Sequence, residues 1–180
     1  MPNRSNARCD SCQKAVRCGR LILLMCAASA AAAEGLVTTS HVSLEFAQKA
    51  VAEALRQCRA DGYRVSVTVT DAAGLAIVTA RADGAGPHTL DSSRRKAYTA
   101  ASLQQPTQNL AELAGTSAAL AGLHQMNDSI LLLGGGFPIR INGIVVGAIG
   151  VGGAPGARLD ETCARAGLQA IGADAYDVAR

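Results

Sequence analysis

The sequence predicts one mixed α/β domain of the α+β type, in which a mainly antiparallel sheet of five strands is covered by helices. Turn residues at 71–74 and at Asn142-Gly143 each separate two short apolar runs, and such hairpins indicate antiparallel pairing. Segments with apolar residues at helical spacing precede, separate and follow these hairpins. With 180 residues, 49% of them hydrophobic, the chain is sized for one domain with one core.

The first predicted helix begins near Ser40, with Thr39, Ser40 and Ser43 as candidate N-caps. Its apolar residues recur at helical spacing and are Leu44, Ala47, Val51, Ala54, Leu55 and Cys58. Residues 61–62 end it. Residues 63–70 alternate valine with serine or threonine, which predicts a half-buried strand. Residues 75–81 are the second strand of the hairpin.

The middle of the chain is more irregular. Residues 83–87 contain Gly and Pro and are predicted to be a loop. A helix is expected over 90–102, capped by Thr89 or Asp91, followed by short helical pieces around 110–113 and 118–123. Strands are expected over 130–133, 137–141 and 144–151, and a closing helix over 159–179. Asp160 and Glu161 fall in the first turn of that helix, where negative charge suits the helix dipole, and we prefer this role to a paired-carboxylate site.

The first 33 residues have the pattern of a secretory signal peptide. Five Lys/Arg precede the apolar run 21–28, and small residues follow it up to Ala33. We therefore expect cleavage near Ala33, a single domain over 34–180, and a periplasmic or secreted protein without a membrane span after cleavage. The alternative is a buried N-terminal helix.

The charges and the cysteines are also distributed differently before and after residue 33. The leader holds five of the 17 Lys/Arg and one of the 14 Asp/Glu, which leaves 12 and 13 in the remainder. A slightly acidic domain with no Trp, two Phe and three Tyr gives no support for nucleic-acid binding. Four of the six cysteines lie in the leader, where Cys9 and Cys12 have no second ligand pair for zinc. Cys58 and Cys163 remain and predict a disulfide between the first and last helices, with two buried thiols as the alternative.

Three blocks indicate a family. Residues 94–100 read RRKAYTA, residues 134–139 read GGGFPI and residues 146–153 read VGAIGVGG. Their order, with DAAG at 71–74 and DETCA at 160–164, resembles the GlcG/HbpS family of the haem-degrading-domain superfamily, over about residues 40–175.

The resemblance implies a profilin-like layered fold, haem as the cofactor or another small molecule as the ligand, and a homo-oligomer. It also implies a link to glycolate or diol utilisation. We expect a binding protein that is non-enzymatic or only incidentally haem-degrading. The rival interpretation is a structural or assembly protein without cofactor, whose glycine-rich strands pack subunit against subunit.

A ligand site is predicted around the start of the 90–102 helix. His88 is the candidate haem iron ligand, and Arg94, Arg95 and Lys96 are candidate partners for carboxylates. Consecutive helical positions point about 100° apart, so one of these cations is expected to turn toward a carboxylate such as Asp71 or Asp83. Gly134, Gly135 and Gly136 either let a flat ligand approach the backbone or form a bend. The alternative for His88 is a loop residue bonded to backbone.

His124 is a weaker candidate ligand, and His41 is expected to be solvated. The glycines at 147–153 lie inside a strand rather than between a strand and a helix, so we expect close backbone packing instead of phosphate binding. No nucleophile, base and acid set is recognisable, and we predict no catalytic residues.

Overall fold

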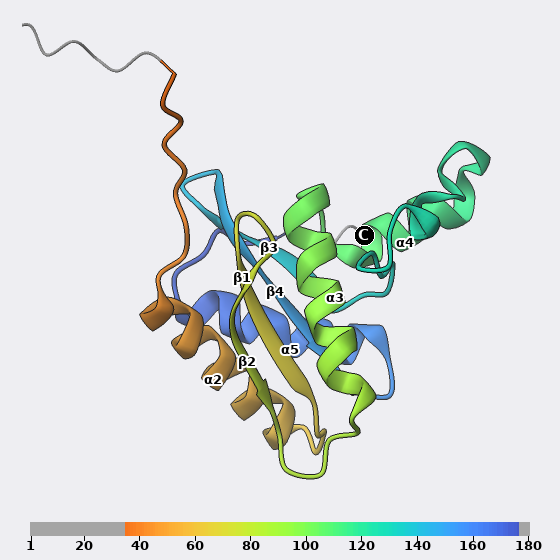
Figure 1. Cartoon of the computed structure of the whole chain (residues 1–180). Coiled ribbons are helices and arrows are strands. Elements are labelled where there is room, and N and C mark those ends of the chain that lie inside the picture. The colour runs from red at the N-terminus through yellow and green to blue at the C-terminus, as the bar shows by residue number, and fades with distance from the viewer. Residues whose placement is uncertain (1–34, 177–180) are drawn as a thin grey trace, which may run out of the picture. The chain divides into compact units, whose positions relative to one another are not determined.

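A computed structural model describes residues 35–176, and its folded unit begins at Thr39. The predicted signal peptide with its cleavage site, and the end of the predicted closing helix beyond residue 176, lie outside the described residues. None of the helices over 35–176 is both long and apolar enough to cross a membrane. The elements in chain order are α2 (Leu44–Ala60), β1 (Ser66–Asp71), β2 (Ala76–Arg81), α3 (His88–Leu103), α4 (Thr107–Thr116), the 3-10 turns η2 (Ala118–Leu120) and η3 (Leu123–Gln125), β3 (Gly136–Ile141), β4 (Ile144–Gly152) and α5 (Ala157–Ala170) (Figure 1).

The sheet is antiparallel with the strand order β2-β1-β4-β3, which confirms the predicted fold class. It has four strands rather than five, because residues 130–133 form no strand. The backbone of residues 130–133 instead makes hydrogen bonds to side chains of α3 and α4. Arg95 Nη2 donates to the carbonyl of Ile130 over 2.7 Å, the amide of Leu131 donates to Thr99 Oγ1 over 2.8 Å, and Thr107 Oγ1 donates to the carbonyl of Leu133 over 2.8 Å.

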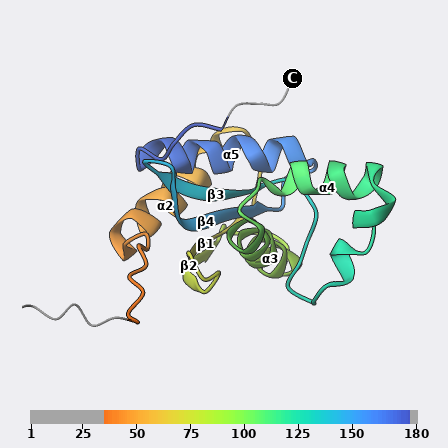
Figure 2. The ribbon, with the colours of Figure 1, turned by 90° about the horizontal axis from the view of Figure 1, so that it is seen from above.

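Helices α2 and α5 cover one face of the sheet and α3 covers the other (Figure 2). The main apolar core lies under α2 and α5, and the predicted disulfide between Cys58 and Cys163 joins these two helices inside it, with the Cα atoms 5.4 Å apart. Buried side chains from the strands complete this core, among them Val65, Val67, Val69, Phe137, Ile139, Ile149 and Val151.

The face under α3 is polar, and this corrects the prediction that β1 is half-buried. The Ser/Thr positions of β1 are fully buried as well as its valines. Ser66 Oγ lies 2.7 Å from Thr89 Oγ1, and Thr68 Oγ1 lies 2.9 Å from Ser93 Oγ, so hydroxyls of α3 satisfy these two. Burying a hydroxyl in this way is tolerated because it keeps a hydrogen bond. The buried Thr70 Oγ1 has no hydrogen-bond partner among the described residues.

Glycines of β4 bring α3 close to the sheet. A Cβ at Gly150 would collide with the carbonyl of Ser93 and lie 2.5 Å from the amide nitrogen of Ala97, and one at Gly152 would collide with Ser92 Oγ. The prediction of close backbone packing for this strand is therefore confirmed.

The predicted helix ends were partly wrong. Ser43, the last of its three candidates, is the N-cap of α2. Helix α3 begins at His88 after Pro87, without a side-chain cap, and Thr89 Oγ1 instead donates to the carbonyl of Gly86 over 2.6 Å. Helix α5 starts at Ala157 and ends at Ala170, well before residue 179. Asp174 then bonds to β3, its amide donating to the carbonyl of Arg140 over 2.8 Å.

Candidate ligand site

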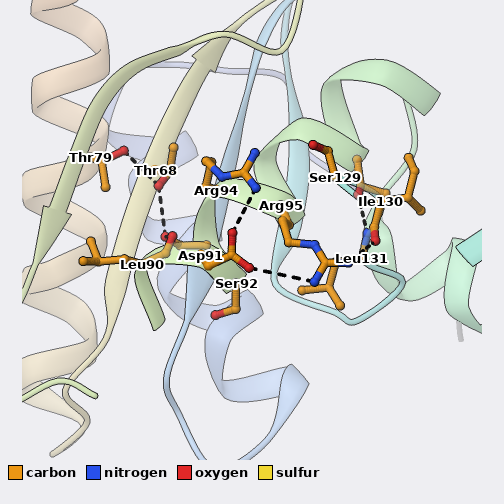
Figure 3. A network of polar contacts seen from close by, with 12 residues as sticks. Thr68, Thr79, Leu90, Asp91, Ser92, Arg94, Arg95, Ser129, Ile130 and Leu131 are labelled. Carbon is orange, nitrogen blue, oxygen red and sulfur yellow. Dashed lines mark hydrogen bonds and ion pairs between the residues drawn. The ribbon is translucent and has the colours of Figure 1, made fainter. Parts of the chain in front are cut away.

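The three consecutive cations of α3 point in different directions, as the helical geometry predicted. Arg94 is exposed, and its Nη2 donates to Asp91 Oδ1 over 2.9 Å. Arg95 crosses to the segment after η3, where it holds the carbonyl of Ile130, and its Nη1 lies 3.8 Å from Asp91 Oδ2 (Figure 3). Both arginines therefore already have acceptors within the chain, and only Arg94 presents its charge on the surface.

Lys96 turns inward. Its Nζ donates to Asp160 Oδ2 over 2.8 Å and to the carbonyl of Val151 over 2.9 Å, and the two charged side chains are 2% and 4% exposed. Asp160 Oδ1 also accepts the amide of Ala154 over 3.0 Å. Burial raises the pKa of Asp160, while Lys96 and this amide oppose the shift. The pair ties α3 to the end of β4 and the start of α5.

This pair corrects two expectations. The carboxylate that faces the inward-pointing cation, Lys96, is Asp160 and not Asp71 or Asp83. Asp71 instead closes its own turn, where Oδ1 accepts the amides of Ala73 and Leu75, each over 2.9 Å. Asp160 does lie in the first turn of α5, but it is an ion-pair partner as well as a complement to the helix dipole.

The glycine bend at 134–136 lies against this pair and is buried. A Cβ at Gly134 would stand 2.6 Å from Gln108 Oε1, one at Gly135 would stand 2.7 Å from the Asp160 Cβ, and one at Gly136 would stand 2.6 Å from the Lys96 carbonyl. Gly135 also has φ +113°, which L side chains rarely adopt. Protein atoms thus occupy the space that a flat ligand would need over this backbone, and the glycines form a packed bend.

His88 lies apart from that bend. It is exposed in the first turn of α3, and eight residues separate it from Lys96, or about 12 Å along the helix. Its ring lies over Gly86, where a Cβ would stand 2.6 Å from Cε1. Within residues 35–176, neither ring nitrogen makes a hydrogen bond. The predicted ligand set is therefore divided into a buried group around Lys96 and an exposed imidazole.

The other histidines are also exposed. His124 lies in η3, beyond α4. His41 Nε2 lies 2.8 Å from Thr39 Oγ1, and its Nδ1 accepts the amide of Ala72 over 3.3 Å. In the part of the chain that the structure describes, no group of three or more His, Cys, Asp or Glu side chains could hold a metal ion.

The described surface includes at least two hollows. One, of about 510 Å³ including the part open to solvent, is lined by Arg59, Tyr63, Arg64, Ala82 and Asp83. The other, of about 370 Å³, lies between α5 and residues 173–176. Sequence reasoning missed the first, because its two arginines belong to a helix end and a connection that no motif marks.

Comparison with known proteins places the chain among proteins associated with haem. Residues 42–169 match the family described as haem degrading protein HbpS-like. A double mutant of HbpS from Streptomyces reticuli is 43% identical, with a TM-score of 0.72 over 78% of this chain and 93% of that one. A complex of PduOC with heme is 25% identical, with a TM-score of 0.71 over 76% of this chain and 99% of that one.

A curated relative is the uncharacterised 15.0 kDa protein of the dhaT-dhaS intergenic region of Citrobacter freundii. It is 39% identical over 90 residues, which are 49% of this chain and 63% of the relative. The chain thus spans less than two thirds of the curated relatives it matches, and only 27% of a second one, the corrinoid adenosyltransferase PduO of Salmonella typhimurium.

Proposed function

The chain belongs to the HbpS-like family of haem degrading proteins, and from this premise we propose that it is an exported protein that binds haem through His88. The structural observation behind this proposal is the His88 imidazole, which is exposed and has no hydrogen-bond partner among residues 35–176. A neutral imidazole with a free nitrogen is a common axial ligand of haem iron. The fold shared with a heme complex of PduOC supports the same ligand.

The residues around His88 fit the polar parts of haem. Haem would supply a redox-active iron. The chain would supply the His88 imidazole for the iron and arginine side chains for the haem carboxylates. Few aromatic side chains are available to pack on the apolar faces of the porphyrin, because the whole chain has only two Phe and three Tyr. A second subunit of the proposed homo-oligomer would cover the face of the porphyrin that one chain leaves open to solvent.

We propose binding rather than turnover. The ion pair of Lys96 and Asp160 is enclosed by protein atoms, so it offers no open acid or base. Within residues 35–176, no carboxylate is hydrogen-bonded to His88, so the orienting partner of a Ser-His-Asp triad is absent there.

Export is part of the proposal. It is supported by the basic and apolar pattern of residues 1–33 and by the disulfide between Cys58 and Cys163, since disulfides persist mainly in oxidising compartments.

A haemin titration of the purified protein tests the binding. We expect a Soret band that saturates at one haem per chain, and a loss of affinity of about tenfold or more in His88→Ala. His124→Ala tests the weaker candidate, and His41→Ala is the matched control, because it removes another exposed imidazole. Unchanged affinity in His88→Ala would rule out His88 as the iron ligand, and a loss in His124→Ala alone would transfer that role to His124.

One observation favours the second candidate function, an assembly protein without cofactor. Residues 104–129 contain no Lys or Arg, and within them Leu113 and Met126 are 48% and 61% exposed. Exposed apolar side chains suit contact between identical subunits, although this segment also carries the exposed carboxylates of Glu112 and Asp128. Sedimentation equilibrium with and without haemin separates the two functions. A stable oligomer that gives no Soret band would favour assembly.

A further inference from the structure

The hollow between the end of α2 and the loop after β2 contains two arginines. Arg59 comes from the last turn of α2, Arg64 from the connection to β1, and Asp83 from the loop 82–87. Tyr63 and Ala82 complete the lining. The charges that line the hollow are therefore two cations and one carboxylate, which leaves a net positive charge.

These two guanidinium groups have no acceptor within residues 35–176, neither a hydrogen bond nor an ion pair closer than 4.0 Å. Most other arginines in this range do have one. The partnered arginines are Arg56, Arg81, Arg94, Arg95, Arg140 and Arg165. Arg59 and Arg64 are thus two neighbouring cations, free to bind an anion from outside the chain.

The fold fixes the position of Arg64. Gly84 has φ +75°, and a Cβ there would stand 3.2 Å from both Cδ and Nη1 of Arg64. The arginine side chain therefore lies across the glycine of the loop. Its own carbonyl is close to Gly153, where a Cβ would stand 2.8 Å from it. The exposed Arg64 side chain thus lies against the loop, while its backbone packs against Gly153 after β4.

The same loop leads directly to His88. The amide of Ala85 donates to the carbonyl of Ala82 over 3.0 Å, and the amide of Thr89 donates to the carbonyl of Gly86 over 3.1 Å. Ala85 is buried, and its carbonyl accepts from Arg81 Nη1. Figure 1 shows this loop joining β2 to α3 at the end of the sheet where α2 also ends. This short, hydrogen-bonded loop thus contributes Ala82 and Asp83 to the hollow that the two arginines line, and it ends at His88.

We propose that Arg59 and Arg64 bind the carboxylates of the ligand whose iron His88 binds. This assignment rests on the proposed function and replaces the buried or paired cations of residues 94–96 as the carboxylate partners. Haem offers one iron and two carboxylates, and the loop region offers one imidazole and two unpaired guanidinium groups. Guanidinium is the side chain best suited to carboxylate, because its planar fork donates two parallel hydrogen bonds.

The test compares haemin with haem dimethyl ester, which keeps the iron and the porphyrin but has no free carboxylate. We expect the unaltered protein to bind haemin about tenfold or more tightly than the ester. The double variant Arg59→Gln/Arg64→Gln is expected to lose that preference and to bind haemin as weakly as the ester, with the Soret maximum unchanged because His88 is intact. Arg56→Gln/Arg158→Gln is the matched control, since it also removes two exposed arginines, and it should leave both affinities unchanged.

The outcomes separate the two proposals. If the unaltered protein binds neither porphyrin, the proposed function fails and this assignment fails with it. If it binds haemin and the ester equally, or if the double variant keeps the preference for haemin, only the arginine assignment is wrong. A double variant that loses affinity for the ester as much as for haemin would also overturn the assignment, because the arginines would then act through packing and not through carboxylates. Both side chains are exposed, so unchanged circular dichroism of the double variant is expected.

Discussion

Replacing Lys96 by methionine will destabilise the fold, because it leaves the Asp160 carboxylate buried without a cation. Lys96 and Asp160 are 2% and 4% exposed, so water cannot substitute for the ammonium group. Methionine keeps most of the side-chain volume but removes the charge together with the hydrogen bonds of Nζ to Asp160 and to the Val151 carbonyl. The substitution therefore isolates the electrostatic contribution of the pair from its packing.

Breaking one half of a buried ion pair costs about 3–5 kcal/mol. For a domain of this size, that corresponds to a fall in Tm of roughly 10–15 °C. The double variant Lys96→Met/Asp160→Asn should recover most of the loss, because it leaves no unpaired charge and keeps an oxygen for the amide of Ala154. Arg94→Gln is the control on the same helix, and its exposed pair with Asp91 is worth about 1 kcal/mol or less.

The dependence on pH distinguishes a buried charge from a loss of packing. Burial already raises the pKa of Asp160, and without Lys96 the shift is larger because the cation no longer opposes it. The folded variant then binds a proton more tightly than the unfolded chain does. Its deficit is therefore greatest at pH values above the folded pKa and shrinks as the pH falls toward the ordinary Asp value of about 4.

Thermal unfolding followed by circular dichroism at pH 7 and pH 5 measures these differences for the parent and the three variants. A Lys96→Met protein that melts within about 2 °C of the parent, or one whose deficit is the same at both pH values, would contradict an essential buried ion pair.

Three further predictions concern the disulfide, the glycine strand and the leader. Converting Cys58 and Cys163 to alanine opens a link across 105 residues and should lower the free energy of unfolding by about 4 kcal/mol or somewhat less, measured as a shift of the denaturant midpoint. Gly150→Ala places a methyl group against the backbone of α3 and should lower the free energy of unfolding by about 1–3 kcal/mol. Gly115→Ala is the control, because Gly115 in α4 has open space around it, and it should be neutral or slightly stabilising. Equal effects of the two substitutions would contradict the packing role of β4. Protein recovered from the periplasm or medium should begin near Glu34 by mass spectrometry, and an intact Met1 in a soluble cytoplasmic form would refute export.

Local features of the fold could be predicted from the sequence because their causes are local. Asn142 and Gly143 adopt φ values of 51° and 78°, the positive values that a tight hairpin requires and that these two residue types accept. The disulfide also followed from the sequence, since both cysteines lie on apolar faces of helices that cover the same side of the sheet.

Features that depend on distant partners could not be predicted. An apolar run such as residues 130–133 resembles a strand, and nothing in it indicates that Arg95, Thr99 and Thr107 take its backbone groups. In the same way, Lys96 and Asp160 are 64 residues apart, and no periodic pattern links them. The arginines of the hollow escaped notice for a related reason, because Arg64 is positioned by a glycine twenty residues later.

The conspicuous sequence blocks that suggested a ligand site are parts of one buried arrangement. Gly135 must lack a side chain because the Asp160 Cβ and the Val151 carbonyl occupy that space, and both groups are there to meet Lys96. The glycines thus leave room for the ion pair of Lys96, and the contacts of Lys96 join α3 to β4 and α5. A ligand competing for that space would have to separate a buried ion pair, at a cost of several kcal/mol. Binding is therefore better sought at groups that make no side-chain hydrogen bond within residues 35–176, among which are His88, Arg59 and Arg64.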